Sequence, residues 1–477
     1  MKSLKQLLLI FSAWLLSMNL TNGQNGHQIE FEIKNYDGKK ITLAYHYGEK
    51  QYIKSELTRQ ESGRFVASGK EALEPGMYIV VLLPSKTTFD FLVNKNEQHF
   101  KLSTDQQDLI ANMKVEGSPE NTRFFKYLNY LSKQRKLSNQ LNEEIKRLQK
   151  STVANKTQKQ AEKKQELEKL GASVNAYQNA IIDMAPDSFT SKIIKAQLPI
   201  QIPADIKNDN KKAFAYYRDH FFDNIDFSDE RMIRTSLIGQ MIKTFYSNQI
   251  TGGNPKITIE NVDRVLKLAE VNQELYKFSL VQSVNSFAKS KSPCMAGVYV
   301  HIVDNYYSKG KASWLKNETL ENMKSSANAL RSSICGKKAP NLKLKDLGFQ
   351  EAQSNLHDVK AKLTVLLFWD PDDPSNSENI PKLVKHYKTR VNKKHLKVYT
   401  VCAANREKMG LTDAFKKCKK QVKDYKMESF FNCIDLNNDS KFRSKYNLKK
   451  TPVIYLLDTD KTILRDRLSV EQFIKLR

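Results

Sequence analysis

The chain has 477 residues, of which 40% are hydrophobic, and its formal net charge is +26. This length exceeds one compact domain and indicates two to four, with enough apolar residues for sizeable cores. Most lysines alternate with Glu, Gln and Asn along helical stretches, which is typical of a solvated helix face rather than of a nucleic-acid-binding surface. We therefore expect no nucleic-acid partner. Anionic partners, such as a phosphorylated glycolipid or an acidic polysaccharide, stay open as an alternative.

Residues 1–23 have the pattern of a secretory signal peptide. Lys2 and Lys5 precede an apolar run, Leu7–Leu16, and a polar, small-residue stretch, Ser17–Gly23, follows. This order is typical of a cleavable export signal, and the run is short for a bilayer crossing. No later segment has the apolar length of a transmembrane helix. We expect a protein of the periplasm or cell envelope that is not transmembrane.

Residues 24–105 are expected to form a small antiparallel β-sandwich. Residues 28–33 and 41–45 alternate apolar and polar side chains, whereas 78–83 and 89–93 are more continuously apolar. Turn residues such as Asp37-Gly38 separate these runs. The pattern predicts about seven strands and contains no catalytic constellation.

Residues 106–335 read as a helical domain with a helical hairpin at about 119–184. Ser118 and Pro119 have the pattern of an N-cap and a first helical residue. A narrow apolar stripe then runs along the hairpin at coiled-coil-like spacing, which leaves two possibilities: the hairpin projects, or it pairs with a second copy of the chain. An aromatic cluster further along the chain is interpreted as core. It comprises Tyr216, Tyr217, Phe221, Phe222, Ile225 and Phe227.

Residues 336–477 change to alternating strands and helices. The runs 363–369, 396–402 and 453–457 read as buried strands, with helices between them and a terminal helix from about Val470. This alternation predicts an α/β domain with a mainly parallel central sheet. The expected fold class of the whole chain is thus multidomain α+β, with a β-sandwich, a helical middle and a C-terminal α/β domain.

The five cysteines are scattered along the second half of the chain. They are Cys294, Cys335, Cys402, Cys418 and Cys433. No two stand at C-x-x-C spacing, and their odd number keeps at least one out of any intrachain disulfide. A disulfide framework is therefore not evident from the sequence.

Three segments carry a resemblance to a known family. Residues 336–344, 368–372 and Thr451-Pro452-Val453 resemble the entry strand, the segment before the active site and the cis-proline turn of TlpA-like and ResA-like thioredoxin (redoxin) domains. Upstream, residues 217–220 and 224–230 resemble segments of envelope thioredoxin-like proteins of three parts. The resemblance implies a thioredoxin-like fold for residues 336–477.

The family's W-x-x-x-C-x-x-C motif is altered in this chain. The same window runs from Trp369 to Asn376, so the attacking cysteine falls on Asp373 and the resolving cysteine on Asn376. Disulfide exchange needs a thiolate attacking a disulfide sulfur, and neither a carboxylate nor a carboxamide can form that bond. Asp373 is instead a good N-cap, and Pro374 suits a first helical position.

The sequence therefore indicates a redox-inactive module that binds a protein or peptide. Trp369, Thr451 and Pro452 are the expected binding residues, because the family's cis-proline turn pairs with a substrate strand. No cofactor and no metal are expected. A weaker metal hypothesis concerns Asp370, Asp372 and Asp373, which lack the glycine and the further ligand of a calcium loop.

Two other functions stay open. One is a thiol–disulfide oxidoreductase that uses a non-standard cysteine such as Cys418, since the surrounding lysines, residues 416–420, would lower the pKa of an exposed thiol. The other is a glycan- or glycolipid-binding envelope protein that works through the β domain and the basic surface. Cys418 lies outside the position of the family's active site, which argues against the oxidoreductase function.

Overall fold

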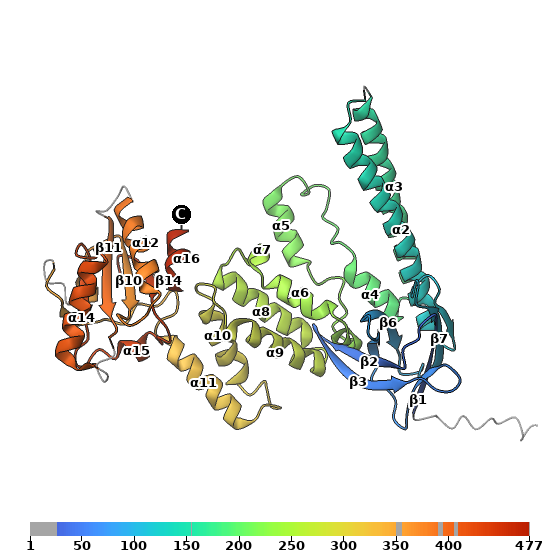
Figure 1. Cartoon of the computed structure of the whole chain (residues 1–477), viewed down its shortest axis with the longest axis horizontal. Coiled ribbons are helices and arrows are strands. Elements are labelled where there is room, and N and C mark those ends of the chain that lie inside the picture. The colour runs from blue at the N-terminus through green and yellow to red at the C-terminus, as the bar shows by residue number, and fades with distance from the viewer. Residues whose placement is uncertain (1–25, 154, 350–354, 390–394, 405–408, 477) are drawn as a thin grey trace, which may run out of the picture. The chain divides into compact units, whose positions relative to one another are not determined.

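The computed structural model describes residues 26–153, 155–349, 355–389, 395–404 and 409–476 (Figure 1). The expected signal peptide, residues 1–23, lies outside this part of the chain. The chain divides into two compact units, Met1–Met241 and Ile242–Arg477. None of the described helices combines the length and the hydropathy that a bilayer crossing requires.

The N-terminal β domain is built from two four-stranded sheets, with strand orders β4-β1-β7-β8 and β3-β2-β5-β6. Aromatic side chains from both sheets fill the space between them, and the rings of Phe31 and Phe91 meet edge to face at 5.4 Å. The strands are β1 His27–Lys34, β2 Lys40–Tyr47, β3 Lys50–Thr58, β4 Phe65–Gly69, β5 Gly76–Leu82, β6 Thr87–Val93, β7 His99–Asp105 and β8 Lys114–Glu116.

One detail of the β domain differs from the prediction. The described part of residues 24–105 holds the predicted seven strands, β1 to β7, and β8 lies beyond that range, but β1 pairs with β7 in parallel. The alternation of apolar residues indicates which face of a strand is buried, but it does not encode the direction of a neighbour that is distant in sequence. The wholly antiparallel sandwich was therefore wrong at this one pair.

A long helical hairpin follows, made of α2 (Pro119–Lys150) and α3 (Lys156–Met184). The Ser118 side chain accepts a hydrogen bond from the backbone N–H of Asn121, so Ser118 is the predicted N-cap. The two helices lie side by side in Figure 1, and Tyr130 of α2 packs on Tyr177 of α3 with ring centroids 4.0 Å apart. Pairing of the hairpin with a second chain stays a prediction.

Shorter helices form the rest of the middle region. They are α4 Phe189–Gln197, α5 Asn210–Asp219, α6 Leu237–Phe245, α7 Asn248–Thr251, α8 Pro255–Ala269, α9 Gln273–Ala288, α10 Ala296–Ile302 and α11 Asn317–Arg331. The predicted aromatic core cluster is mostly buried, and the rings of Phe221 and Phe222 meet at 5.0 Å. Tyr216 and Tyr217 of the same cluster are only half-buried. The cluster is therefore core at its C-terminal end and surface at its N-terminal end.

The C-terminal domain has a six-stranded sheet of order β14-β13-β10-β11-β12-β9. Its strands are β9 Lys345–Asp346, β10 Leu363–Trp369, β11 Leu396–Cys402, β12 Phe431–Ile434, β13 Val453–Leu457 and β14 Ile463–Leu468. Its helices are α12 Asn376–Thr389, α14 Leu411–Asp424, α15 Phe442–Lys445 and α16 Val470–Ile474. Separate apolar cores cover the two faces of the sheet.

This sheet is mixed rather than mainly parallel. β10, β11 and β12 run parallel, but β13 is antiparallel to β10, and β14 and β9 are antiparallel to their neighbours. The tight turn between β13 and β14 forces an antiparallel pair, because a parallel pair needs a long crossover connection. The multidomain α+β class is confirmed, and the mainly parallel sheet was wrong.

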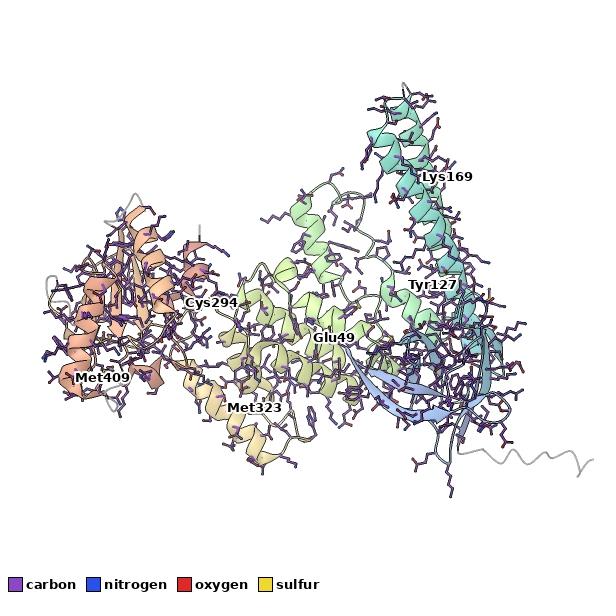
Figure 2. All side chains as sticks on the ribbon, in the orientation of Figure 1. Glu49, Tyr127, Lys169, Cys294, Met323 and Met409 are labelled. Carbon is purple, nitrogen blue, oxygen red and sulfur yellow. A yellow bond between two sulfur atoms is a disulfide. The ribbon has the colours of Figure 1, made fainter. Side chains whose placement is uncertain are left out.

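The structure contains two disulfides that were not evident from the sequence. Cys294 is joined to Cys335, and Cys402 is joined to Cys418. Cys433 takes part in neither bridge. Figure 2 labels Cys294, which precedes α10, while Cys335 stands at the entry of the C-terminal domain. The sequence did not reveal these pairs because the fold brings together cysteines that have no diagnostic spacing.

Candidate functional site

The family's active-site position lies where the central strand β10 ends and the chain turns into α12. Asp373 and Asn376 both belong to this turn, and the Thr451-Pro452 turn faces it just before β13. Trp369, expected at the binding surface, is instead fully buried in the core between the sheet and its helices. Its indole N–H has no hydrogen-bond partner within the described residues. Trp369 therefore lies beneath the site and does not form its surface.

Asp373 is the best-connected side chain of the turn. Its Oδ1 accepts hydrogen bonds from the backbone N–H of Ser375 at 3.0 Å and from the Ser375 hydroxyl at 2.7 Å. Its Oδ2 accepts one from the hydroxyl of Thr451 at 3.0 Å. The acid at the family's thiol position thus ties its own turn to the cis-proline turn.

The cap differs in detail from the prediction. The backbone N–H of Asn376 donates to the carbonyl of Asp373 at 3.1 Å, and the first α-helical bond runs from Asn379 to Ser375 at 3.0 Å. Asp373 therefore caps a tight turn that precedes α12, and Pro374 lies in this turn rather than at the first helical position. The helix begins two residues later than expected, because a hydrogen bond between residues three apart, as in a 3₁₀ turn, closes this segment first.

The electrostatics of Asp373 follow from these contacts. Partial burial acts to raise the pKa of its carboxyl, but the hydrogen bonds from Ser375 and Thr451 together hold that pKa below its ordinary value. Hydrogen bonds to a carboxylate favour its charged form. At neutral pH the site therefore carries a fixed negative charge where the family has a thiol.

Asn376, at the resolving position, is fully buried. Its side-chain N–H donates to the carbonyl of Asp370, while its Oδ1 has no hydrogen-bond partner in the part of the chain that the structure describes. The amide therefore holds the turn from inside. It also leaves one acceptor oxygen unsatisfied in the family's reaction site.

The Thr451–Pro452 peptide bond is cis, as the resemblance implied, and a second cis bond at Leu83–Pro84 was not expected. Both Thr451 and Pro452 are half-buried. No hydrogen bond to another described residue engages the backbone N–H or C=O of Thr451. Within the part of the chain that the structure describes, the fold therefore leaves both backbone groups of Thr451 without a partner.

Helix α14 packs against the turn at 370–373, a contact that sequence reasoning missed. Lys417 pairs with the carboxylate of Asp372, and the side-chain N–H of Gln421 donates to the carbonyl of Pro371 at 2.8 Å. Asp370 lies 3.8 Å from Arg443. The three acids considered for a metal thus have different partners, and within the described residues they do not gather into a metal-binding group. The one-turn spacing of Lys417 and Gln421 was the signal available in the sequence.

Cys418 is not the exposed thiol that the lysine-rich segment suggested. It is fully buried and bonded to Cys402, which lies opposite Trp369 in the register of β10 and β11. The buried residues Ala414, Cys418 and Val422 share one face of α14, and this face packs on the sheet. A role for Cys418 as a reactive surface thiol is therefore wrong.

Cys433, the cysteine outside both bridges, is also fully buried, in strand β12. Burial raises the pKa of its thiol to about 12, although a hydrogen bond with Tyr399 acts to lower it. A thiol with so high a pKa is almost entirely protonated at neutral pH, and the thiolate is the reactive form. The chain therefore has no cysteine of the activated kind at this site.

Three family models match successive parts of the chain. Residues 27–124 match a domain of unknown function (DUF4369), and residues 139–333 match a second domain of unknown function (DUF5106). Residues 335–466 match the AhpC/TSA family. No curated protein matches the chain.

Several solved structures are similar to parts of the chain. A thioredoxin-like protein from Bacteroides caccae is 18% identical and covers 58% of this chain and 97% of its own, with a TM-score of 0.44. A domain of a possible thiol-disulfide isomerase from Cytophaga hutchinsonii is 30% identical and covers 29% and 88%, with a TM-score of 0.25. The thioredoxin domain of a thiol-disulfide oxidoreductase from Bacteroides vulgatus is 22% identical and covers 30% and 98%, with a TM-score of 0.24.

The sheet order, the turn after β10 and the AhpC/TSA match define a thioredoxin-like fold for the C-terminal domain. Residues 335–466 are thus a redoxin domain of the AhpC/TSA kind, and in this chain a β domain and a helical middle region precede it. The resemblance stated from the sequence is confirmed.

Proposed function

We propose that this chain is a redox-inactive member of its family, whose redoxin domain binds an extended segment of another protein. The observation that carries the proposal is the hydrogen bond of 3.0 Å between Asp373, at the attacking position, and Thr451 of the cis-proline turn. The two halves of the family site are joined to each other by a carboxylate. They no longer flank a thiol.

Thiol–disulfide exchange requires a sulfur nucleophile that reaches a substrate disulfide. The positions of the family's two cysteines hold Asp373 and Asn376. Neither a carboxylate nor a carboxamide forms the sulfur–sulfur bond of a mixed disulfide. Of the five cysteines, four are in disulfides and Cys433 is fully buried. These features support an inactive site in a chain whose relatives are thiol–disulfide oxidoreductases.

Binding is supported by the backbone of the cis-proline turn. The N–H and C=O of Thr451 have no partner among the described residues, and an extended peptide can pair with such groups by β-strand addition. The adjacent carboxylate of Asp373 favours segments with a basic residue near the pairing position. The side chain of Thr451 is already engaged, so the backbone supplies the contact.

The expected export signal at residues 1–23 supports a location in the periplasm or cell envelope. The partner is then an exported protein or peptide.

The helical hairpin offers a separate route to self-association, which analytical ultracentrifugation of the full chain would measure.

An insulin-reduction assay with dithiothreitol tests the inactive site. The parent chain is expected to match the rate of dithiothreitol alone, and the Asp373→Cys/Asn376→Cys variant is expected to exceed it. Enzyme-like turnover by the parent chain would contradict the proposal. A Cys402→Ala/Cys418→Ala variant then shows whether that turnover comes from the buried pair.

Fluorescence anisotropy with labelled, carboxymethylated α-lactalbumin tests peptide binding, because this probe stays unfolded and has no thiols. Thr451→Trp is expected to block binding by its bulk, whereas Thr451→Val removes the same hydroxyl and keeps the backbone accessible. Retained binding by both variants would contradict pairing at this turn, and absence of binding by the parent chain would contradict the function itself.

A further inference from the structure

A cavity in the first unit, far in sequence from the redoxin site, has no role in the proposed function. Its volume is about 510 Å³, and it is lined by α3, by the segment 198–201, by α5 and by the turn that follows α5. All of these residues belong to one compact unit. The volume falls in the range of about 300–1,000 Å³ that is usual for sites of small ligands.

One wall of the cavity is rich in side-chain amides. Asn175 and Asn179 are exposed and one turn apart on α3, and neither side chain makes a hydrogen bond to another described residue. Asn is a poor helix former, so helix stability does not account for two of them at this place. Gln201 and Asn224 add two more amides, and each donates to a nearby backbone carbonyl while its oxygen stays available.

The part of the lining contributed by α5 and the turn after it carries a flat aromatic surface. The ring of Tyr216 stacks on that of His220, with centroids 3.9 Å apart and planes inclined by 24°. Nδ1 of His220 lies 2.5 Å from Oδ2 of Asp223. This contact orients the imidazole on which the phenol ring stacks. Tyr216, one of the two residues of the aromatic cluster that are not core, therefore presents a flat ring to the cavity.

The charge of the lining excludes one class of ligand. The chain carries a net charge of +26, yet none of the described residues that line this cavity is Lys or Arg. Phosphate and sulfate groups are usually held by such residues. The carboxylate of Asp223 makes the cavity still less suitable for an anion.

We propose that this cavity binds a neutral saccharide. Amides and a carboxylate match hydroxyl groups, because hydroxyls both donate and accept hydrogen bonds. The apolar C–H face of a sugar ring can pack on Tyr216. An extended peptide is a poorer match, because helices and a loop line the cavity and no strand edge is present among the described residues there for main-chain pairing. The site differs from the β domain, where the sequence led us to consider glycan binding.

Isothermal titration of the full chain tests the proposal with cellotriose, maltotriose and triacetylchitotriose as probes. At least one probe is expected to bind with a dissociation constant of about 1 mM or tighter. Tyr216→Ala is expected to weaken binding about tenfold, and Tyr216→Phe is expected to restore most of it. Asn179→Ala is also expected to weaken binding of the same probe.

The matched controls lie on the same helices. Phe214 of α5 is 45% exposed and does not line the cavity, so Phe214→Ala should bind like the parent chain. Gln165→Ala is the corresponding control on α3. Circular dichroism confirms that each variant is folded. Binding of none of the three probes, equal binding by Tyr216→Ala and the parent, or displacement of the sugar by an unfolded peptide would overturn the proposal.

Discussion

The carboxylate of Asp373 accepts three hydrogen bonds at the position where the family has a nucleophilic sulfur. A thiolate there would be a weaker acceptor and would need to stay accessible to react. The acid instead joins its turn to Thr451, so the site gains internal contacts as it loses chemistry. The change of one residue type therefore alters both the reactivity and the local stability of the turn.

This contact predicts a pH-dependent stability of the α12 region. Because the pKa of Asp373 is lowered in the folded chain, its stabilisation is complete above the ordinary Asp value, about 4, and is lost as the pH falls through the folded value. Asp373→Ala should reduce the local stability of α12 by about 1 kcal/mol at pH 7, the usual magnitude of a lost cap. Hydrogen exchange on the full chain measures this loss.

The same measurement at about pH 3 should show a smaller difference between Asp373→Ala and the parent chain, since the carboxylate is then being protonated. Asp413→Ala is the control, because Asp413 is exposed in the first turn of α14. An equal loss of stability at both pH values would show that the charge of Asp373 does not contribute.

At the scale of elements, apolar runs located the central strands well. The predicted strands 363–369 and 453–457 coincide with β10 and β13, because both are buried and almost wholly apolar. The two-residue strand β9 escaped prediction because so short a segment has no detectable period. The directions of β7 and β13 depend on how the chain returns to the sheet, which local patterns do not record.

Within the candidate site, the sequence located Asp373, Asn376, Thr451 and Pro452 by resemblance, but it did not indicate which side chains bond to them. Cys418 shows why local charge misleads. The lysines around it are exposed or half-buried, while Cys418 shares the buried face of α14 with Ala414 and Val422. Spacing of four residues along a helix decided its burial, and nearby charge did not.

The bridge between Cys402 and Cys418 attaches α14 to β11 of the sheet, beside the turn at 370–373. The two cysteines are 16 residues apart in sequence. Closing a loop of this length lowers the entropy of the unfolded chain and stabilises the folded state by about 3 kcal/mol. Cys402→Ala/Cys418→Ala should lower the unfolding free energy of the redoxin domain by about this amount. Urea unfolding of the full chain, followed by hydrogen exchange in α14, measures the change.

Cys433→Ala provides the control for this element, since it alters a buried cysteine of the same domain without touching a bridge. It should retain both disulfides and lose less stability than the double variant. If reduction of the parent chain leaves α14 fully protected from exchange, the bridge does not hold this helix.

At the scale of the whole molecule, the second unit, Ile242–Arg477, contains the later helices of the middle region together with the redoxin domain. Cys294 and Cys335, 41 residues apart in sequence, join the segment before α10 to the entry of the redoxin domain. The buried carboxylate of Asp466 reinforces this junction by accepting the backbone N–H of Cys294 at 2.7 Å. Covalent and polar contacts therefore coincide at the junction.

Limited proteolysis should report on this junction. Under oxidising conditions, a cut between residues 295 and 334 should leave two fragments that migrate together until dithiothreitol separates them. Cys294→Ser/Cys335→Ser should separate without reductant and should be cut faster near the junction, since the closed loop of 41 residues contributes about 4 kcal/mol. Equal rates of cutting in both chains would show that Asp466 and packing suffice.

The burial of Cys433 bears on how the chain acquires its bridges during oxidative folding. Disulfides rearrange when a thiolate attacks one of their sulfurs, so any accessible cysteine left over from pairing can scramble the rest. Once β12 has joined the sheet, this sulfur is enclosed and protonated. Completion of the sheet thus removes the one internal agent that could undo the native connectivity.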